Sequence, residues 1–234
     1  MNKPPKIAVL FMGKPGAGKG TQAEILVEKY GLTHFNTGEI IRHRLANPET
    51  DQDKKEMEIY QSGVLNSPEW VAGLVTETAH RYATEDKGIV FSGSPRTLYE
   101  AERLIPQLIA DYGKDKVIAI YLDIDDHHAV SRNSGRLTCD GCGFTTTVPA
   151  GELQAKIGTV CPKCGGKFIQ RAIDTAEKII EKRLPEFMGR TLPTIELMRK
   201  EGIVSELDGR GSVAEVAQKV AAVVDPIAKK ILNQ

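Results

Sequence analysis

Short apolar runs alternate with longer amphipathic segments along most of this chain. The apolar runs lie at residues 7–12, 33–35, 88–91, 117–122 and 203–207. Their lengths and polar flanks are typical of buried β-strands. Apolar residues recur with helical spacing in the segments at 21–30, 68–82, 98–111, 175–199 and 213–231. This alternation predicts an α/β fold in which helices cover both faces of a doubly wound, five-stranded parallel sheet.

The alternation fails in two places. Residues 36–67 are polar and rich in charge, and residues 134–169 are rich in glycine, cysteine and threonine. Both segments are interpreted as insertions into the sheet domain. We therefore predict a core made of residues 1–36, 67–131 and 174–234, with one insertion at 37–66 and another at 132–173.

The first apolar run leads into a glycine-rich loop and then into a helix. Residues 13–20 match the pattern G-x-x-x-x-G-K-[ST] except that Gly20 occupies the last position and Thr21 follows it. Glycines let the backbone turn its N–H groups inward, and the next helix directs the positive end of its dipole at the same point. Lys19 adds a cation for the outer phosphates. The loop is therefore predicted to bind a polyphosphate.

The composition excludes several classes of function. The chain has 234 residues, 41% of them apolar, and its 31 basic residues balance 31 acidic ones. A chain of this size can bury its own core in one or two domains. Without a net positive charge it lacks the field that attracts nucleic acid. No apolar run is long enough for a membrane span, and no signal peptide precedes the first strand, so we expect a cytoplasmic protein without a membrane partner.

All four cysteines lie in the second insertion. They form two C-x-x-C pairs with 18 residues between them, at Cys139, Cys142, Cys161 and Cys164. This spacing is typical of a zinc ribbon, and four thiolates leave no open position, so we predict a structural Zn²⁺. Disulfides are the alternative, but they are rare in a reducing compartment. A nucleic-acid-binding ribbon is disfavoured because residues 139–164 contain one aromatic residue and two lysines.

Several arginines lie at the borders of predicted elements and insertions. They are Arg42, Arg96, Arg132, Arg136, Arg171 and Arg183. A closing lid would bring them toward the glycine loop. Phosphoryl transfer needs such convergence, because guanidinium groups bind the charged oxygens of the transferring group in pairs. The histidines show no metal-ligand spacing; they are His34, His43, His80, His127 and His128.

The ordered motifs resemble those of the adenylate kinases and related nucleoside monophosphate kinases, in particular the branch with a long, zinc-containing lid. The resemblance runs over nearly the whole chain and is anchored at residues 13–22, 36–42, 93–97, 132–136, 170–174, 182–184 and 207–209 and at the cysteine pairs. In that family Gly-Thr follows the loop lysine. The resemblance implies a fold like that of P-loop nucleoside triphosphate hydrolases, an NMP-binding segment at 37–66 and a lid at 132–173. We expect a monomer.

The resemblance also implies an activity, the reversible transfer of a phosphoryl group from ATP, with Mg²⁺, to AMP, giving two ADP. The residues at catalytic positions are Lys19, Arg96, Arg132, Arg136, Arg171 and Arg183. Those at ATP-binding positions are Gly16, Ala17, Gly18, Lys19, Gly20, Thr21, Arg132, Arg136 and Gly211. Those at AMP-binding positions are Thr37, Arg42, Val64, Leu65, Asn66, Gly93, Arg96, Glu100, Arg171 and Arg183.

Some positions depart from the family pattern. Ser92 stands where the family carries an aspartate that orders magnesium-bound water, and Glu39 replaces another aspartate nearby. Glu100 stands where the family has a glutamine that reads the base of the monophosphate. A carboxylate accepts hydrogen bonds but does not donate them, which suits guanine better than adenine. The alternatives are therefore a kinase for another monophosphate, such as GMP or a pyrimidine nucleotide, and a weakly active nucleotide-binding regulatory protein.

Overall fold

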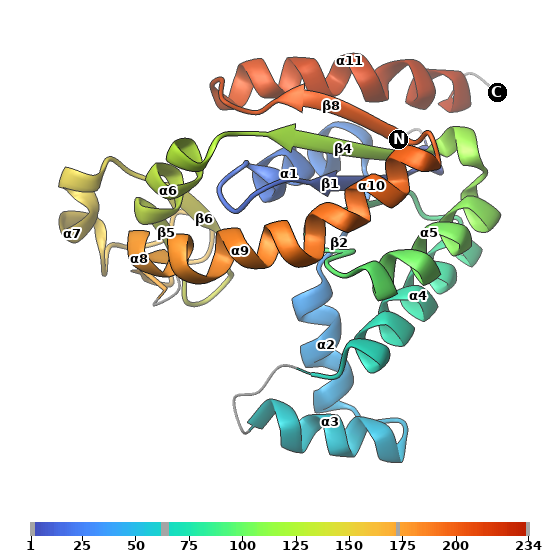
Figure 1. Cartoon of the computed structure of the whole chain (residues 1–234), viewed down its shortest axis with the longest axis horizontal. Helices are drawn as coiled ribbons and strands as arrows, with labels where there is room; N and C mark the ends of the chain where they lie inside the picture. The colour runs from blue at the N-terminus through green and yellow to red at the C-terminus, as the bar shows by residue number, and fades with distance from the viewer. Residues whose placement is uncertain (1–2, 62–65, 172–173, 233–234) are drawn as a thin grey trace.

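A five-stranded parallel sheet forms the centre of the protein (Figure 1). The computed structural model describes residues 3–61, 66–171 and 174–232. The strand order is β2-β3-β1-β4-β8. The strands are β1 (Ala8–Met12), β2 (Thr33–Phe35), β3 (Ile89–Phe91), β4 (Val117–Asp123) and β8 (Val204–Asp208). Their positions and parallel pairing confirm the predicted α/β fold class.

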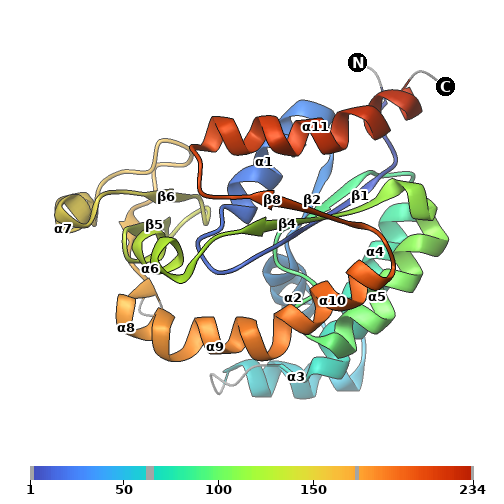
Figure 2. The same cartoon turned by 45° about the horizontal axis from the view of Figure 1, so that its top comes forward.

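Helices cover both faces of this sheet (Figure 2). On one face lie α1 (Lys19–Tyr30) and α11 (Val213–Leu232), and on the other α4 (Pro68–Thr84), α5 (Leu98–Tyr112) and α10 (Leu192–Lys200). Successive side chains of β1 point to opposite faces, so Val9 packs with Leu26 of α1 whereas Leu10 packs with Leu104 of α5. Among the described helices, none is both long and apolar enough to cross a membrane.

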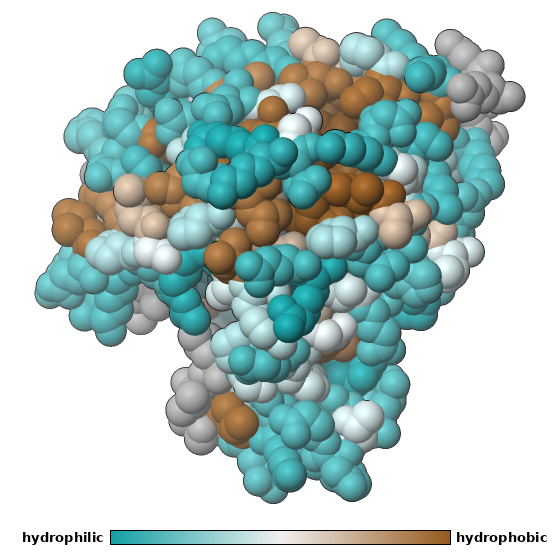
Figure 3. Space-filling view, turned by 45° about the vertical axis from the view of Figure 1, so that its right-hand side comes forward, coloured by the Kyte–Doolittle hydropathy of each residue, from teal (hydrophilic) through white to brown (hydrophobic). Residues whose placement is uncertain are grey.

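The first insertion forms two helices beyond the sheet, α2 (Thr37–Ala46) and α3 (Asp51–Gln61). Asn36 caps α2, because its side chain accepts a hydrogen bond from the backbone N–H of Glu39. The polar sequence of this insertion does not predict these helices. Figure 3 shows that the described surface of this lobe, at the bottom of the view, is mostly hydrophilic.

The second insertion is a small antiparallel sheet with the strand order β6-β5-β7. It follows α6 (Asp126–Ser134) and contains β5 (Arg136–Cys139), β6 (Thr145–Thr147), the short turn η2 (Ala150–Glu152), α7 (Leu153–Lys156) and β7 (Phe168–Ile169). Its buried apolar core consists of only Leu137, Cys139, Cys161 and Phe168 among the described residues. Such a small core leaves the cysteine cluster as the centre of this segment.

A curved helical run returns from the second insertion to the sheet domain. It comprises α8 (Ala176–Lys178), η4 (Ile179–Arg183), α9 (Leu184–Glu186) and η5 (Phe187–Thr191), and it continues into α10. The segments η4 and η5 are π-helical, whereas the sequence predicts one regular helix over 175–199. Each π turn ends just before a Leu-Pro pair, at Pro185 and Pro193. Because proline lacks an N–H and its ring collides with the carbonyl four residues earlier, the preceding turn widens. A short turn, η1 (Lys114–Lys116), precedes β4.

Candidate active site

The glycine loop joins the end of β1 to the start of α1. Gly13, Gly16 and Gly18 have positive φ angles of 141°, 83° and 89°. A Cβ atom at Gly13 would lie 2.5 Å from the carbonyl oxygen of Leu122, and one at Gly16 would lie 2.5 Å from the amide nitrogen of Asn133. The loop therefore requires glycine at both places. Ala17 is buried and closes a turn through its N–H to the carbonyl of Lys14, at 3.1 Å.

Lys19 occupies the first turn of α1 and folds back over the loop. Its Nζ donates hydrogen bonds to the carbonyl oxygens of Gly13, at 2.7 Å, and Lys14, at 2.9 Å. Burial and the positive charges of Arg136, Arg96 and Arg183 together lower the pKa of Lys19 to about 7, and burial is the largest cause. These arginines come from three separate segments of the chain, and all three lie near enough to Lys19 for their charges to influence it. Gly20 and the exposed Thr21 follow in the same turn.

One buried carboxylate holds most of this arginine cluster together. Asp174 is fully buried and accepts hydrogen bonds from Arg171 Nε at 2.7 Å and Arg183 Nη1 at 2.5 Å. Arg136 Nη1 lies 3.9 Å from the same carboxyl group. Burial lowers the pKa of Arg136 to about 10, although Asp174 acts against this change. A single negative charge does not balance three guanidinium groups, so the cluster keeps an excess of positive charge facing Lys19.

Arg132 joins the glycine loop to the loop after β8. It donates hydrogen bonds to the carbonyl oxygens of Gly209, at 2.8 Å, and Gly211, at 3.2 Å, and a longer one to that of Gly16, at 3.5 Å. Asn133, the next residue, is fully buried and accepts a hydrogen bond from Arg183 Nη1 at 3.1 Å. Sequence reasoning missed Asn133, because nothing in an isolated asparagine shows which turn of a helix faces the loop.

The start of the first insertion contacts the core near Ser94 and Glu100. Thr37 Oγ1 lies 2.6 Å from Ser94 Oγ. Glu100 is only 4% exposed, and its Oε2 accepts a hydrogen bond from the backbone N–H of Arg96 at 2.7 Å. Its Oε1 is buried without a hydrogen-bond partner among the described residues. Burial raises the pKa of the Glu100 carboxyl, although the Arg96 N–H and the Ser94 hydroxyl act against this rise.

The remaining residues at predicted AMP-binding positions are less closely joined to the cluster. The Arg96 side chain is exposed and donates from Nε to the carbonyl of Gly93 at 2.7 Å. Arg42 is exposed on α2, beside Gly38, and no contact among the described residues joins it to the loop. Asn66 donates from its side chain to the carboxyl group of Glu56 at 2.9 Å. Val64 and Leu65 lie outside the described residues.

Ser92, at the carboxyl end of β3, pairs with a histidine from the neighbouring strand. Its Oγ lies 2.8 Å from His34 Nε2 in β2. Burial lowers the pKa of His34, against the opposite influence of the Glu24 and Glu39 carboxylates. The sequence suggested no role for His34, because the two residues are far apart in the chain. An uncharged pair thus stands at the edge of the sheet, close to where β1 runs into the glycine loop.

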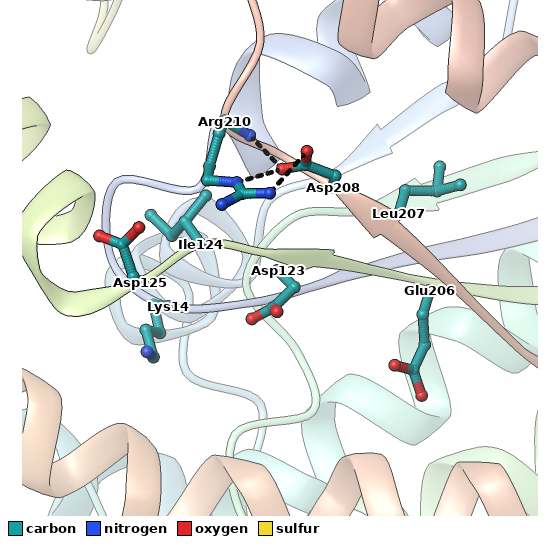
Figure 4. Close-up of a pocket in the computed structure, with 8 residues that line it drawn as sticks. All are labelled: Lys14, Asp123, Ile124, Asp125, Glu206, Leu207, Asp208 and Arg210. Atoms are coloured by element: carbon teal, nitrogen blue, oxygen red, sulfur yellow. Dashed lines mark hydrogen bonds and ion pairs between the residues drawn. The ribbon is translucent and has the colours of Figure 1, made fainter.

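A cavity of about 490 Å³ lies beyond the ends of β4 and β8 (Figure 4). Its lining residues are Lys14, Asp123, Ile124, Asp125, Glu206, Leu207, Asp208 and Arg210. Four carboxylates outnumber two cations there, so the cavity does not suit a polyphosphate. The excess of positive charge lies instead on the side of the glycine loop that holds Lys19 and the arginines around Asp174.

The four cysteines come together in the second insertion. Their sulfur atoms all lie within 4.8 Å of one another, with Cys139 and Cys164 at 3.5 Å and Cys142 and Cys161 at 3.8 Å. None of them forms a disulfide. A tetrahedral zinc ion with bonds of about 2.3 Å separates its sulfur ligands by about 3.8 Å. The cluster therefore has the dimensions of an S₄ metal site.

Comparison with known proteins gives a consistent result. A family model described as adenylate kinase matches residues 11–203 of the chain. A curated adenylate kinase from Fervidobacterium nodosum is 37% identical over 224 residues, which cover 95% of this chain and 99% of that protein. Adenylate kinases from Paracoccus denitrificans and Halobacterium salinarum are each 35% identical, and the aligned regions cover 94% and 93% of this chain and 98% and 96% of those proteins.

Proposed function

This chain belongs to the adenylate kinase family, and on that premise we propose that it transfers the γ-phosphoryl group of ATP reversibly to AMP, giving two ADP. The observation that carries the proposal is the convergence of positive charge on Lys19. Burial and three arginines lower the pKa of this lysine to about 7 in the absence of an anion. A bound polyphosphate would remove that repulsion, so the site favours a highly charged anion.

The ATP side of the proposed site is the glycine loop with its flanking residues. The backbone of Gly16, Ala17, Gly18, Gly20 and Thr21 would hold the phosphates, with Lys19 over the outer ones. Arg132, Arg136 and the backbone at Gly211 would enclose the nucleotide. The exposed Thr21 hydroxyl and Glu39 carboxylate offer the oxygen ligands that Mg²⁺ prefers. When bound with ATP, Mg²⁺ would neutralise phosphate charge; Ser92 would contribute a hydroxyl where the family has a carboxylate.

The AMP side of the proposed site lies between the first insertion and the arginine cluster. The residues assigned to AMP are Thr37, Arg42, Val64, Leu65, Asn66, Gly93, Arg96, Glu100, Arg171 and Arg183. Arg171 and Arg183 are held by Asp174 and would face the AMP phosphate and the transferring group. Arg42 would join them when the first insertion approaches the core.

In the proposed reaction, an oxygen of the AMP phosphate forms a bond to the γ-phosphorus as the bond from that phosphorus to the β-bridging oxygen breaks. ADP is the leaving group, and the acceptor becomes ADP. No side chain acts as a nucleophile. The protein contributes alignment, neutralisation of charge by Lys19 and the arginines, and exclusion of water by the closing segments.

Glu100 supports AMP as the acceptor when its carboxyl group is protonated. A neutral carboxyl group has one O–H donor and one acceptor, as a glutamine amide does, so it can pair with adenine N1 and the exocyclic amine. Burial, which raises the pKa of Glu100, favours that form. Ionised Glu100 would instead accept from the two N–H donors of guanine. GMP is therefore the second candidate acceptor, favoured by the unpartnered Oε1 of Glu100.

We assign the four-cysteine cluster to a structural Zn²⁺. The S₄ donor set and its dimensions suit zinc, and four protein ligands would leave no position for a substrate. The proposed lid comprises residues 132–173, the NMP-binding segment residues 37–66, and the core residues 1–36, 67–131 and 174–234. A cytoplasmic monomer without nucleic-acid or membrane partners stays a prediction from the sequence.

A coupled assay that measures ADP formation from ATP with AMP, GMP, CMP or UMP tests the proposal. We expect AMP to be the preferred acceptor and Lys19→Met to lower kcat by about a hundredfold or more. Lys230→Met, which changes an exposed lysine of α11, serves as the control. Transfer to GMP alone would change the assigned acceptor. Nucleotide binding without transfer to any monophosphate would support the regulatory alternative instead.

A further inference from the structure

A second group of metal-ligating side chains lies at the start of α6, away from the cysteines. Asp125, His127 and His128 place their ligand atoms within 4.8 Å of one another. The two imidazole rings have an edge-to-face arrangement with centroids 5.8 Å apart. Among the described residues, this is the one metal-ligating cluster besides the cysteines. The sequence alone does not suggest it, because adjacent histidines on a helix usually diverge.

Asp125 fixes the geometry of this group. It is the N-cap of α6, and its Oδ1 accepts a hydrogen bond from the backbone N–H of His128 at 2.9 Å. The His128 ring points back toward the same carboxylate, with Nδ1 2.8 Å from Oδ2. Metal–ligand bonds of about 2.1 Å place neighbouring ligands about 3.0 to 3.4 Å apart. A metal ion therefore requires this pair of atoms to separate by only a few tenths of an ångström.

The surrounding charges favour a cation. Asp125 lines the acidic cavity beyond β4 and β8, in which carboxylates outnumber cations (Figure 4). The two cations of that cavity are already paired, Lys14 with Asp126 at 2.6 Å and Arg210 with Asp208 at 2.8 Å. The positive end of the α6 dipole opposes a cation. That opposition is small beside three coordinate bonds, and the acidic cavity offsets it.

We propose that Asp125, His127 and His128 form a second metal site, which takes a late first-row divalent ion such as Ni²⁺, Co²⁺, Cu²⁺ or Zn²⁺. Two imidazoles and one carboxylate suit these ions, whereas Mg²⁺ and Ca²⁺ require oxygen ligands. The site is exposed to solvent, so water completes the coordination. The same helix carries Arg132 in its last turn, which contacts the glycine loop at Gly16, so a metal here would occupy the opposite end of that helix.

Cobalt distinguishes this site from the cysteine cluster. The protein is first loaded with one equivalent of Zn²⁺ to fill the cysteines, and Co²⁺ is then titrated by absorption and by calorimetry. We expect one further equivalent to bind, with a ligand-field spectrum that lacks the strong thiolate-to-cobalt charge-transfer band. We expect His127→Gln and His128→Gln each to weaken binding about tenfold to a hundredfold.

Two further variants keep the test decisive. Asp125→Asn retains a good N-cap but replaces the carboxylate with a weakly ligating amide, so α6 persists while Co²⁺ affinity falls. His80→Gln is the matched control, because His80 is an exposed histidine that pairs with Asp111 at 2.9 Å and has no second imidazole beside it. The proposal is overturned if no second equivalent binds, if both histidine variants bind Co²⁺ as the parent does, or if His80→Gln weakens binding equally.

Discussion

The two insertions of this protein are small, yet they are held in place by different chemistry. The first insertion is fastened by two buried carboxylates of α3. Asp53 accepts hydrogen bonds from Trp70 Nε1, at 2.7 Å, and from the backbone of Glu49, at 2.9 Å. Glu56 is fully buried and accepts from the backbone N–H of Ser67 at 3.0 Å. These donors come from the chain that enters α3 and from the start of α4, so the insertion is bound to the core by hydrogen bonds.

The second insertion instead depends on its four cysteines and a very small apolar core. Segments too small to bury a core need another source of cohesion, and a metal ion is one such source. The difference predicts opposite sensitivities. Burial acts to raise the pKa values of Asp53 and Glu56, but hydrogen bonds outweigh it and lower both. The first insertion should therefore be weakened only as pH falls through those lowered values, whereas the second should fail when the proposed metal is removed.

Of the changes that distinguish the two insertions, removal of the proposed zinc ion should lower thermal stability the most. Structural zinc contributes about 10–16 kcal/mol in zinc-finger peptides. Even a fraction of that should lower Tm by about 10 °C, at about 2–4 °C per kcal/mol. We expect stability to fall more than the intrinsic rate of transfer does. Calorimetry with and without a chelator, at matched nucleotide concentration, measures the change.

The single tryptophan provides the control for this experiment. Trp70 is hydrogen-bonded to Asp53, so its fluorescence reports on the first insertion. We expect its emission to be unchanged when the chelator releases the lid. Equal melting temperatures with and without chelator would reject a structural zinc site. A shift of Trp70 emission on addition of chelator, below the melting temperature, would show that loss of the metal also disturbs the first insertion.

Glu56→Ala tests whether the buried carboxylates of α3 hold the first insertion to the core. The change leaves the Ser67 N–H and the Asn66 amide without their buried acceptor and should cost about 3 kcal/mol. We expect a shift of Trp70 emission and a higher KM for AMP, with zinc affinity unchanged. Urea unfolding measures the loss. The exposed Glu58 on the same helix gives the control, because Glu58→Ala should change stability by less than about 0.5 kcal/mol. If Glu56→Ala and Glu58→Ala lower the free energy of unfolding equally, Glu56 does not hold the first insertion to the core.

The same contrast explains which features the sequence could predict. The central strands β1, β3 and β4 are buried on both faces, so they are continuous apolar runs. The structure places all five strands within a residue or two of their predicted positions, including the less buried β2 and β8. The sequence does not predict α2 and α3, because neither helix has an apolar stripe. The buried residues of α3 are Asp53 and Glu56. The π turns are not predicted either, since helical periodicity does not record a widened turn before proline.

The candidate site shows a similar division. The glycine loop is contiguous, so sequence alone indicates its conformation, and the positive φ angles of Gly13, Gly16 and Gly18 agree with that expectation. Contacts between distant segments are different. The sequence gives no sign that Asp174 gathers Arg171 and Arg183, or that Ser92 meets His34, because each contact depends on how far the strands and helices extend. Such contacts require the folded structure.

Glu100→Gln tests whether the carboxyl group of Glu100, in α5, recognises the base of the monophosphate. In the parent, KM for AMP should rise as pH increases through the raised pKa of Glu100, because ionisation removes the donor to adenine N1. A mispaired buried group costs about 1 to 3 kcal/mol, which corresponds to a rise of about fivefold to a hundredfold. Glutamine cannot ionise, so the variant should have a flat profile. KM for AMP measured between pH 5 and about pH 9 checks this, and parallel profiles for parent and variant would exclude Glu100 from base recognition.

The smallest effect concerns the exposed contact of the lid with the core. Lys163, between Cys161 and Cys164, pairs with Glu24 of α1 at 3.1 Å and lies over the Phe144 ring. Exposed ion pairs contribute about 0.2 to 1 kcal/mol and weaken in salt. Lys163→Met should therefore raise KM for ATP by about 1.4-fold to fivefold at low salt and less at high salt. The charge-reversed pair Glu24→Lys with Lys163→Glu should restore part of the loss, whereas Lys156→Met, at another exposed lysine of the lid, should have no effect. If the reversed pair is no better than its two single variants, the contact does not hold the lid, and the lid would then depend on its metal and on the arginines alone.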